Sequence, residues 1–130
     1  MDSIFQEDEY GCGTACVAML FQVSYAEAAQ ICDDVYWKGY GIDKKPMINL
    51  LKQLGFRIEG EGRIGPKTPL ISLTNDALLV GSLLPTRGSI KARENTYSHW
   101  MVWDSKEKAI RDPYRFTKPI WVTSYISVAR

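Results

Sequence analysis

The sequence predicts an α+β fold, in which N-terminal helices pack on an antiparallel β-sheet built from the C-terminal half of the chain. Up to about residue 55, apolar residues recur at helical spacing, with capping residues between the helical segments. Beyond Gly55, short apolar runs alternate with stretches rich in glycine, proline and charge. The chain has 130 residues, 45% of them hydrophobic. We therefore expect one domain, 1–130, with a helical part at about 1–55 and a sheet part at about 56–130.

Three helices are expected in the first half. An apolar run predicts the first over residues 13–22. The second starts at Ser24, a good N-cap with Glu27 completing a capping box, and runs to about residue 34. The third starts at residue 44 or 46 and stops at Gly55.

The second half contains six segments of strand type. Each is short and apolar, and turn residues separate it from the next. The predicted strands are 56–59, 70–73, 78–84, 99–104, 109–112 and 120–128. The polar stretch 85–95 is the best candidate for a mobile loop.

Charge and hydropathy exclude several classes of function. The net charge of +1 lacks the basic excess expected of a nucleic-acid binder. No apolar run approaches the roughly 20 residues needed to cross a bilayer, so no membrane association is expected. The first residues lack the pattern of a signal peptide. We expect a soluble cytoplasmic protein, or a domain of something larger, with delivery by another system left open.

The three cysteines do not suggest a disulfide framework, because their number is odd and they cluster early in the chain. Cys12 and Cys16, one helical turn apart, give at most three soft ligands with His99, whereas structural zinc sites usually have four. No metal and no cofactor is therefore expected. A thiol redox or metal module built on Cys12 and Cys16 stays open as a minor alternative. Cys16 and Cys32 are interpreted as core residues.

Cys12 has the surroundings of a nucleophile. It lies between two glycines at the start of the first predicted helix. Glycine permits a tight turn and the close approach of another molecule. A helix start favours a thiolate through its unpaired N–H groups and the positive end of its dipole. Gln6, six residues upstream, is placed to supply an amide donor to an oxyanion site.

A base for this thiol comes from the only histidine of the chain, His99, which opens the predicted strand 99–104. The strands 99–104 and 109–112 are expected to form a hairpin, which brings the start of the first beside the end of the second. His99 and Asp112 should then be close enough for the carboxylate to orient the imidazole. Asp104 and Asn95 remain alternative orienting residues, and an Asp-Pro pair is also a common turn opener.

The order of these residues resembles that of the papain-like cysteine peptidase superfamily, and within it the bacteriocin-processing peptidases that cut after a double glycine. Members begin with a glutamine six residues before a Cys-Gly at a helix start, like Gln6 and Cys12 here. They continue with a histidine opening an apolar strand, like His99, and an Asp-Pro after a β-turn, like Asp112. The segment 49–56 is also similar to the family's region between cysteine and histidine. The similarity spans roughly residues 4–115.

The resemblance implies a papain-like fold in a bacterial or phage protein, with a peptide or protein as substrate. It implies that His99 activates Cys12, that Asp112 orients His99, and that Gln6 and the Cys12 backbone N–H bind the oxyanion. The expected activity is hydrolysis of a peptide bond through a thioester. Two alternatives remain: a deamidase or isopeptidase with the same triad, or a non-catalytic peptide- or protein-binding module. The shape of the cleft discriminates among the enzymes, since an extended peptide needs an open groove.

Overall fold

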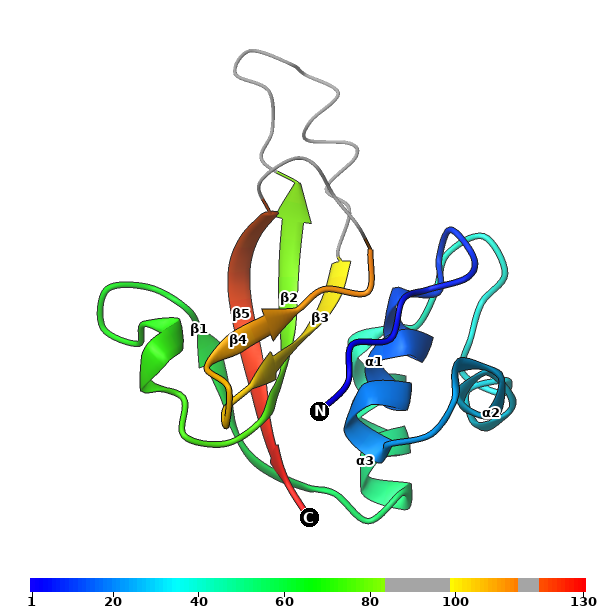
Figure 1. The fold of residues 1–130 in the computed structure, drawn as a ribbon, viewed down its shortest axis with the longest axis horizontal. Helices are drawn as coiled ribbons and strands as arrows, with labels where there is room; N and C mark the ends of the chain where they lie inside the picture. Colours follow the sequence, from blue (N-terminus) through cyan, green and yellow to red (C-terminus); the bar gives the residue numbers. More distant parts are fainter. Residues whose placement is uncertain (84–98, 115–119) are drawn as a thin grey trace.

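A computed structural model describes residues 1–83, 99–114 and 120–130. Over these residues, three α-helices precede a five-stranded sheet (Figure 1). The helices are α1 (Cys12–Phe21), α2 (Tyr25–Ile31) and α3 (Lys44–Gln53). The strands are β1 (Arg57–Arg63), β2 (Ala77–Leu83), β3 (His99–Asp104), β4 (Ala109–Arg111) and β5 (Ile120–Ala129), and a short 3₁₀ helix, η1 (Leu70–Ser72), lies between β1 and β2. The α+β class predicted from the sequence is thus confirmed.

The predicted start of the second helix and the predicted end of the third are confirmed, whereas α2 ends at Ile31, before the predicted residue 34. The Glu27 backbone N–H donates to Ser24 Oγ at 3.1 Å, which fixes the start of α2. After α3 the chain turns at Gly55, whose φ of +94° is a conformation that glycine adopts without strain. Local backbone and capping interactions therefore set the start of α2 and the end of α3.

The sheet is antiparallel throughout, with strand order β1-β5-β2-β3-β4. Consecutive strands β2, β3 and β4 are neighbours, whereas β5 inserts between β1 and β2. The register of β1 on β5 shifts between Ile58 and Gly60, as in a β-bulge. The pairing continues beyond this shift to Arg63, so β1 is longer than the predicted strand 56–59.

The helices pack on one face of this sheet, and the main hydrophobic core lies between them (Figure 1). Strand residues on this face alternate with residues on the other, as the two-residue period of a strand requires. The strands contribute Leu78, Trp100, Val102, Ile126 and Val128 to this core, and α1 contributes most of its length. Strand β3 is buried on both faces, which explains why its sequence is apolar almost throughout.

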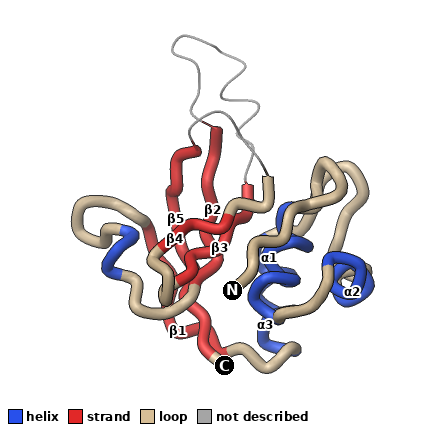
Figure 2. The backbone as a smooth tube through the Cα atoms, viewed as in Figure 1, coloured by secondary structure: helices blue, strands red, loops and turns tan. Residues whose placement is uncertain are grey.

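The opposite face of the sheet carries a second, smaller cluster around Leu79, Met101 and Trp103. The segment containing η1 covers it, and Figure 2 shows this short helix on the far side of the strands from α1–α3. The strand predicted for residues 70–73 is therefore wrong. A run of four residues is too short for periodicity to separate strand from helix.

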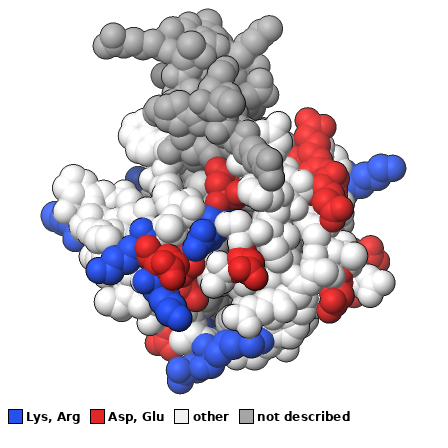
Figure 3. All heavy atoms as spheres, viewed as in Figure 1, with Lys and Arg blue, Asp and Glu red and all other residues white. Residues whose placement is uncertain are grey.

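The remaining sequence predictions have mixed outcomes. The mobile loop predicted at 85–95 lies outside the described residues. None of the helices in the described part of the chain has the length and apolar character of a membrane span. On the face shown in Figure 3, basic side chains lie mainly at the left and bottom with some acidic ones among them, and the charged side chains on the right are mostly acidic.

Candidate active site

Cys12 is the first residue of α1, and its side chain reaches the surface only slightly, with 7% of the residue exposed. A tight turn leads into it, because the Gly11 backbone N–H donates to the Asp8 carbonyl at 3.1 Å. The first intrahelical bond, from Ala15 N–H to the Gly11 carbonyl, leaves the N–H groups of the first turn without helical acceptors. The positive end of the helix dipole thus lies at this thiol.

The two glycines beside Cys12 make room for the protein's own side chains. A Cβ on Gly11 would collide with the Tyr25 hydroxyl, which donates to Asp8 Oδ2 at 2.8 Å. A Cβ on Gly13 would lie 3.1–3.2 Å from atoms of Met47, Ile42 and Trp100. The sequence predicts a tight turn and the close approach of another molecule at these glycines; the turn is present, and the atoms that lie closest to both glycines belong to the protein itself.

His99 and Asp112 meet at one end of the β3–β4 hairpin. His99 is the first residue of β3, and Asp112 directly follows β4. The His99 Nε2 atom lies 2.7 Å from Asp112 Oδ1, and the two side chains are 4% and 25% exposed. The hairpin predicted from the spacing of the strands is confirmed, with Asp104 paired to Ala109 at its closed end.

Asp112 also organises its own turn. Its Oδ1 atom accepts a hydrogen bond from the Tyr114 backbone N–H at 2.9 Å. This bond from an aspartate to the backbone two residues on is typical of an Asx turn. Asp112 therefore opens a turn and orients His99 at once, so the two interpretations of the Asp-Pro pair are compatible.

The His99 ring is hydrogen-bonded to Cys12 as well as to Asp112. Since Nε2 lies on Asp112, Nδ1 is the ring nitrogen left for the sulfur. Burial acts to lower the pKa of His99, but the hydrogen bonds to Asp112 and Cys12 and their negative charge together raise it from 6.5 to about 9. A protonated imidazole can donate from both nitrogens, so His99 can bond to the Cys12 sulfur on one side and to the Asp112 carboxylate on the other.

Asp104, the alternative orienting residue, is engaged elsewhere. It is buried, accepts from the Glu107 backbone N–H at 3.2 Å, and pairs with Arg111 at 3.1 Å. Burial acts to raise the pKa of Asp104, but these two donors outweigh it and hold the pKa below the usual value. Asp104 thus closes the hairpin turn away from His99. Asn95 lies outside the described residues.

Gln6 lies next to both the cysteine turn and the aspartate turn. Its backbone N–H donates to the Pro113 carbonyl at 2.9 Å. Its side-chain Nε2 donates to the carbonyls of Asp8 and Glu9, each at 3.0 Å. Both amide hydrogens are thus engaged, and the buried Oε1 has no hydrogen-bond partner among the described residues. Gln6 is near the site, but its amide does not point a free donor at it.

The other two cysteines are core residues, as predicted. All three thiols are free, and both Cys16 and Cys32 are fully buried. Burial, with a smaller contribution from charge on Cys12, raises the pKa of Cys16 well above its ordinary value. Burial also raises the pKa of Cys32 to about 11, against an opposing hydrogen bond from Thr14. Neither thiol has the surroundings of a nucleophile.

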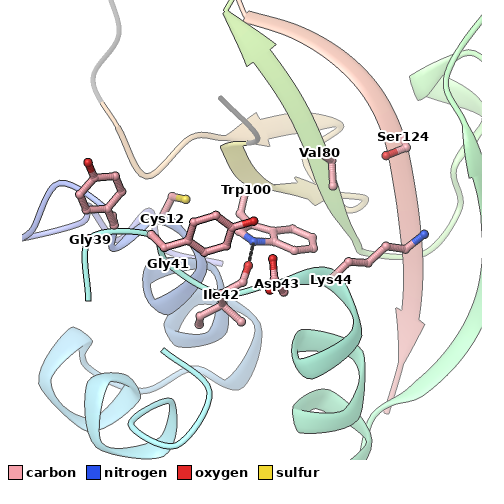
Figure 4. A pocket seen from close by; sticks show the side chains of 11 residues that line it. Cys12, Gly39, Gly41, Ile42, Asp43, Lys44, Val80, Trp100 and Ser124 are labelled. Atoms are coloured by element: carbon pink, nitrogen blue, oxygen red, sulfur yellow. Dashed lines mark hydrogen bonds between the residues drawn. The ribbon is translucent and has the colours of Figure 1, made fainter. Parts of the chain in front are cut away.

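A pocket of about 390 Å³ opens beside Cys12. The loop between α2 and α3 forms one wall and the sheet forms the other, so both halves of the chain contribute. The lining residues are Tyr10, Cys12, Gly39, Tyr40, Gly41, Ile42, Asp43, Lys44, Val80, Trp100 and Ser124. Figure 4 shows Cys12 at one end, Lys44 and Ser124 at the other, and the Trp100 ring between them.

Trp100 joins the two walls. Its indole Nε1–H crosses from β3 to donate to the Ile42 carbonyl at 2.8 Å (Figure 4). Tyr40 lines the pocket together with Trp100, whereas Trp37 is exposed outside it and Trp103 faces the other side of the sheet. Sequence reasoning missed Val80 and Ser124, which are direct partners across β2 and β5. No local motif signals them.

The described residues contain no group of three or more histidine, cysteine, aspartate or glutamate side chains placed to hold a metal ion. Comparison of the chain with models of known protein families gave no match, and a search of the curated proteins gave none either.

Proposed function

We propose that this protein is a cysteine peptidase of the papain-like type. The observation that carries the proposal is the continuous chain of hydrogen bonds from Cys12 through His99 to Asp112, with the thiol at a helix N-terminus. A nucleophile, a base and a group that orients the base are the three parts that such catalysis needs.

The arrangement of elements supports a papain-like fold. The nucleophile begins a helix that packs against an antiparallel sheet, and that sheet carries the histidine and the aspartate. The chain order glutamine, cysteine, histidine and aspartate matches that of the papain-like family. The packing of α1 on the sheet brings Cys12 to His99 and Asp112, so the same arrangement supports both the proposed fold and the proposed chemistry.

The proposed reaction is acyl transfer to water. With its proton on His99, the Cys12 sulfur attacks the carbonyl carbon and forms a C–S bond. The C–N bond then breaks, and the leaving amine takes the proton from His99. Water attacks the thioester, gives a proton to His99 and releases the acid, which restores the thiol–imidazole pair. Asp112 keeps Nδ1 of the ring directed at the sulfur throughout.

The developing oxyanion is stabilised by the N-terminus of α1. The Cys12 backbone N–H is the main-chain donor in this proposal, and the helix dipole adds to it. Gln6 contributes its amide to the oxyanion only if it releases the carbonyl of Asp8 or Glu9. Loss of one oxyanion donor typically costs about 2.7–4 kcal/mol of transition-state stabilisation.

The pocket supports a peptide as substrate. His99 protonates the leaving amine. The amine part of the substrate must therefore lie on the side of the sulfur that faces His99. Among the described residues, the pocket is lined by Cys12 but by neither His99 nor Asp112, so it lies on the acyl side. Tyr40, Asp43 and Lys44 at its rim are exposed, which leaves the pocket open to solvent. An open acyl-side groove suits an extended peptide better than the side-chain amide that a deamidase takes.

The test is alkylation by iodoacetamide at about pH 6, where ordinary thiols are almost fully protonated. Mass spectrometry then maps the label in wild type and His99→Ala. Selective labelling of Cys12 that is lost in the variant supports an activated pair. A peptide library then distinguishes bond cleavage from ammonia release. If Cys12 labels no faster than Cys32 and His99→Ala changes nothing, the proposal fails and a binding module takes its place.

A further inference from the structure

Gln6 connects the two turns that hold the reacting groups. Its backbone bonds to Pro113, which directly follows Asp112. Its side chain bonds to the carbonyls of Asp8 and Glu9, in the turn that leads to Cys12. A single residue thus links the sheet half of the site to the helical half.

On the sheet side, the link acts one residue from the group that orients His99. The Pro113 carbonyl accepts the Gln6 backbone N–H at 2.9 Å, and Pro113 is buried. Asp112 directly precedes Pro113, and its Oδ1 atom lies 2.7 Å from His99 Nε2. Proline restricts the backbone here, so a displacement of the N-terminal segment is transmitted to the turn rather than absorbed by it.

On the helical side, the link holds the turn that sets the position of Cys12. The Asp8 carbonyl accepts two donors, the Gln6 amide at 3.0 Å and the Gly11 backbone N–H at 3.1 Å. The Asp8 carboxylate is held in turn by the Tyr25 hydroxyl. Gly11 directly precedes Cys12, so the carbonyl that Gln6 holds is also the one that closes the turn.

The orientation of the Gln6 amide follows from its partners. Both are carbonyl oxygens, which accept but do not donate, so the amide nitrogen must face them. Oε1 is then left buried without a partner among the described residues. A buried unpaired acceptor is unfavourable, and the two hydrogen bonds must outweigh that cost for this orientation to be adopted.

We propose that Gln6 is a positioning residue, which bridges the Asp112–Pro113 turn and the Asp8–Gly11 turn and thereby fixes Cys12 against His99 in the free protein. This role differs from that of an oxyanion donor, which acts only once a substrate carbonyl is present. The effect of Gln6 on catalysis rests on the proposed function, whereas its effect on the position of Cys12 relative to His99 does not.

Alkylation separates the two roles, because iodoacetamide reacts with the thiolate at a saturated carbon and forms no oxyanion. The test compares wild type, Gln6→Met and the matched control Gln30→Met, which makes the same change at an exposed position of α2. Methionine keeps the length of the side chain and removes both donors. We expect Cys12 of Gln6→Met to label roughly tenfold more slowly, about the effect of two neutral hydrogen bonds.

A second readout does not depend on reactivity. His99 is the only histidine, so its ring resonance in an NMR pH titration needs no further assignment. In Gln6→Met we expect the pKa of His99 to fall from about 9 towards 6.5, because its contacts to Cys12 and Asp112 loosen. Gln30→Met should leave both the titration and the labelling rate unchanged. A residue that only stabilises the fold would lower the thermal midpoint and leave the titration of the folded protein in place.

Each outcome has one meaning. Slower labelling together with a lower His99 pKa supports the bridge. Unchanged labelling and titration in a folded Gln6→Met overturn it, even if peptide hydrolysis is lost, since that pattern belongs to an oxyanion donor. If Gln6→Met does not fold, Gln6→Asn gives the same comparison, because its shorter amide cannot reach both carbonyls. If wild-type Cys12 shows no dependence on His99, the proposed function fails, and the His99 titration still decides the bridge.

Discussion

The His99 Nε2 and Asp112 Oδ1 atoms lie 2.7 Å apart, although the two residues are thirteen positions apart in the sequence. The hairpin of β3 and β4 brings them together, and the Asx turn at Asp112 fixes the carboxylate that faces the ring. The imidazole of the proposed base is therefore held by a local hairpin, while the thiol it faces comes from a helix at the other end of the chain.

The raised pKa of His99 predicts a pH-dependent stability. The pKa is about 9 in the folded protein, against an ordinary value of 6.5 that applies to the unfolded chain. Protonation of His99 therefore stabilises the fold fully below pH 6.5, and this contribution is lost as the pH rises through about 9. Relative to His99→Gln, wild type should lose up to about 3 kcal/mol of unfolding free energy across this range. Urea unfolding at several pH values measures this, and parallel curves for the two proteins would contradict it.

Asp112 and Asp104 provide a matched pair for the orienting role. Asp112→Asn should lower peptide hydrolysis by as much as about 10⁴-fold, the effect seen when the carboxylate of a Ser-His-Asp triad is replaced. It should also lower the pKa of His99, because a negative charge beside the ring is lost.

Asp104→Asn is the control, since this residue pairs with Arg111 instead. We expect a loss of stability without a change in the titration of His99. Assays of hydrolysis and NMR titration of both variants test the assignment. An Asp104→Asn protein with a lowered His99 pKa would transfer the orienting role to Asp104.

Substitutions of Trp100 and Trp103 test whether the pocket binds substrate, because Trp100 lines the pocket and Trp103 lies on the opposite face of the sheet. Trp100→Phe removes the bond from the indole to the Ile42 carbonyl and alters the centre of the pocket. Trp103→Phe removes a bond to the Leu73 carbonyl on the opposite face of the sheet. Each should cost about 1–3 kcal/mol of stability, because a carbonyl loses its donor. Only Trp100→Phe should raise KM for a peptide substrate, and equal KM values would argue against an acyl-side groove.

Gly11 and Tyr25 should be energetically coupled. Gly11→Ala places a Cβ against the Tyr25 hydroxyl and must displace it from Asp8. We expect a loss of about 1–3 kcal/mol in the wild-type background. In Tyr25→Phe the obstructing oxygen is absent, so the same substitution should cost less. A double-mutant cycle by chemical denaturation measures the difference, and additive effects would show that the clash is relieved in another way.

Much of the site could be predicted because its determinants are local in sequence. Ser24 and Gly55 bound their helices through interactions with nearby backbone, and the spacing of two short strands sets the hairpin that joins His99 to Asp112. The pairing of Cys12 with His99 could be predicted because a reactive thiol needs a base and the chain has one histidine. The structure brings these two side chains into contact.

The features that sequence reasoning misses depend on contacts between distant segments. The glycines beside Cys12 fit side chains from α2, α3 and β3, which no local pattern reveals. The orientation of the Gln6 amide is set by carbonyls that become its partners only once the turn has formed. In β1, Gly60 is expected to end the strand, but it sits at a register shift and pairing continues past it.

The position of β5 in the sheet has a consequence for timing. This strand is made last among the elements described, yet it lies between β1 and β2, and β2 carries the hairpin of His99. The segment that forms α1 leaves the ribosome early, so a growing chain carries its thiol long before the sheet that presents the imidazole can close. On the proposed function, the pairing of Cys12 with His99 is therefore completed only once β5 is available to join β1 to β2.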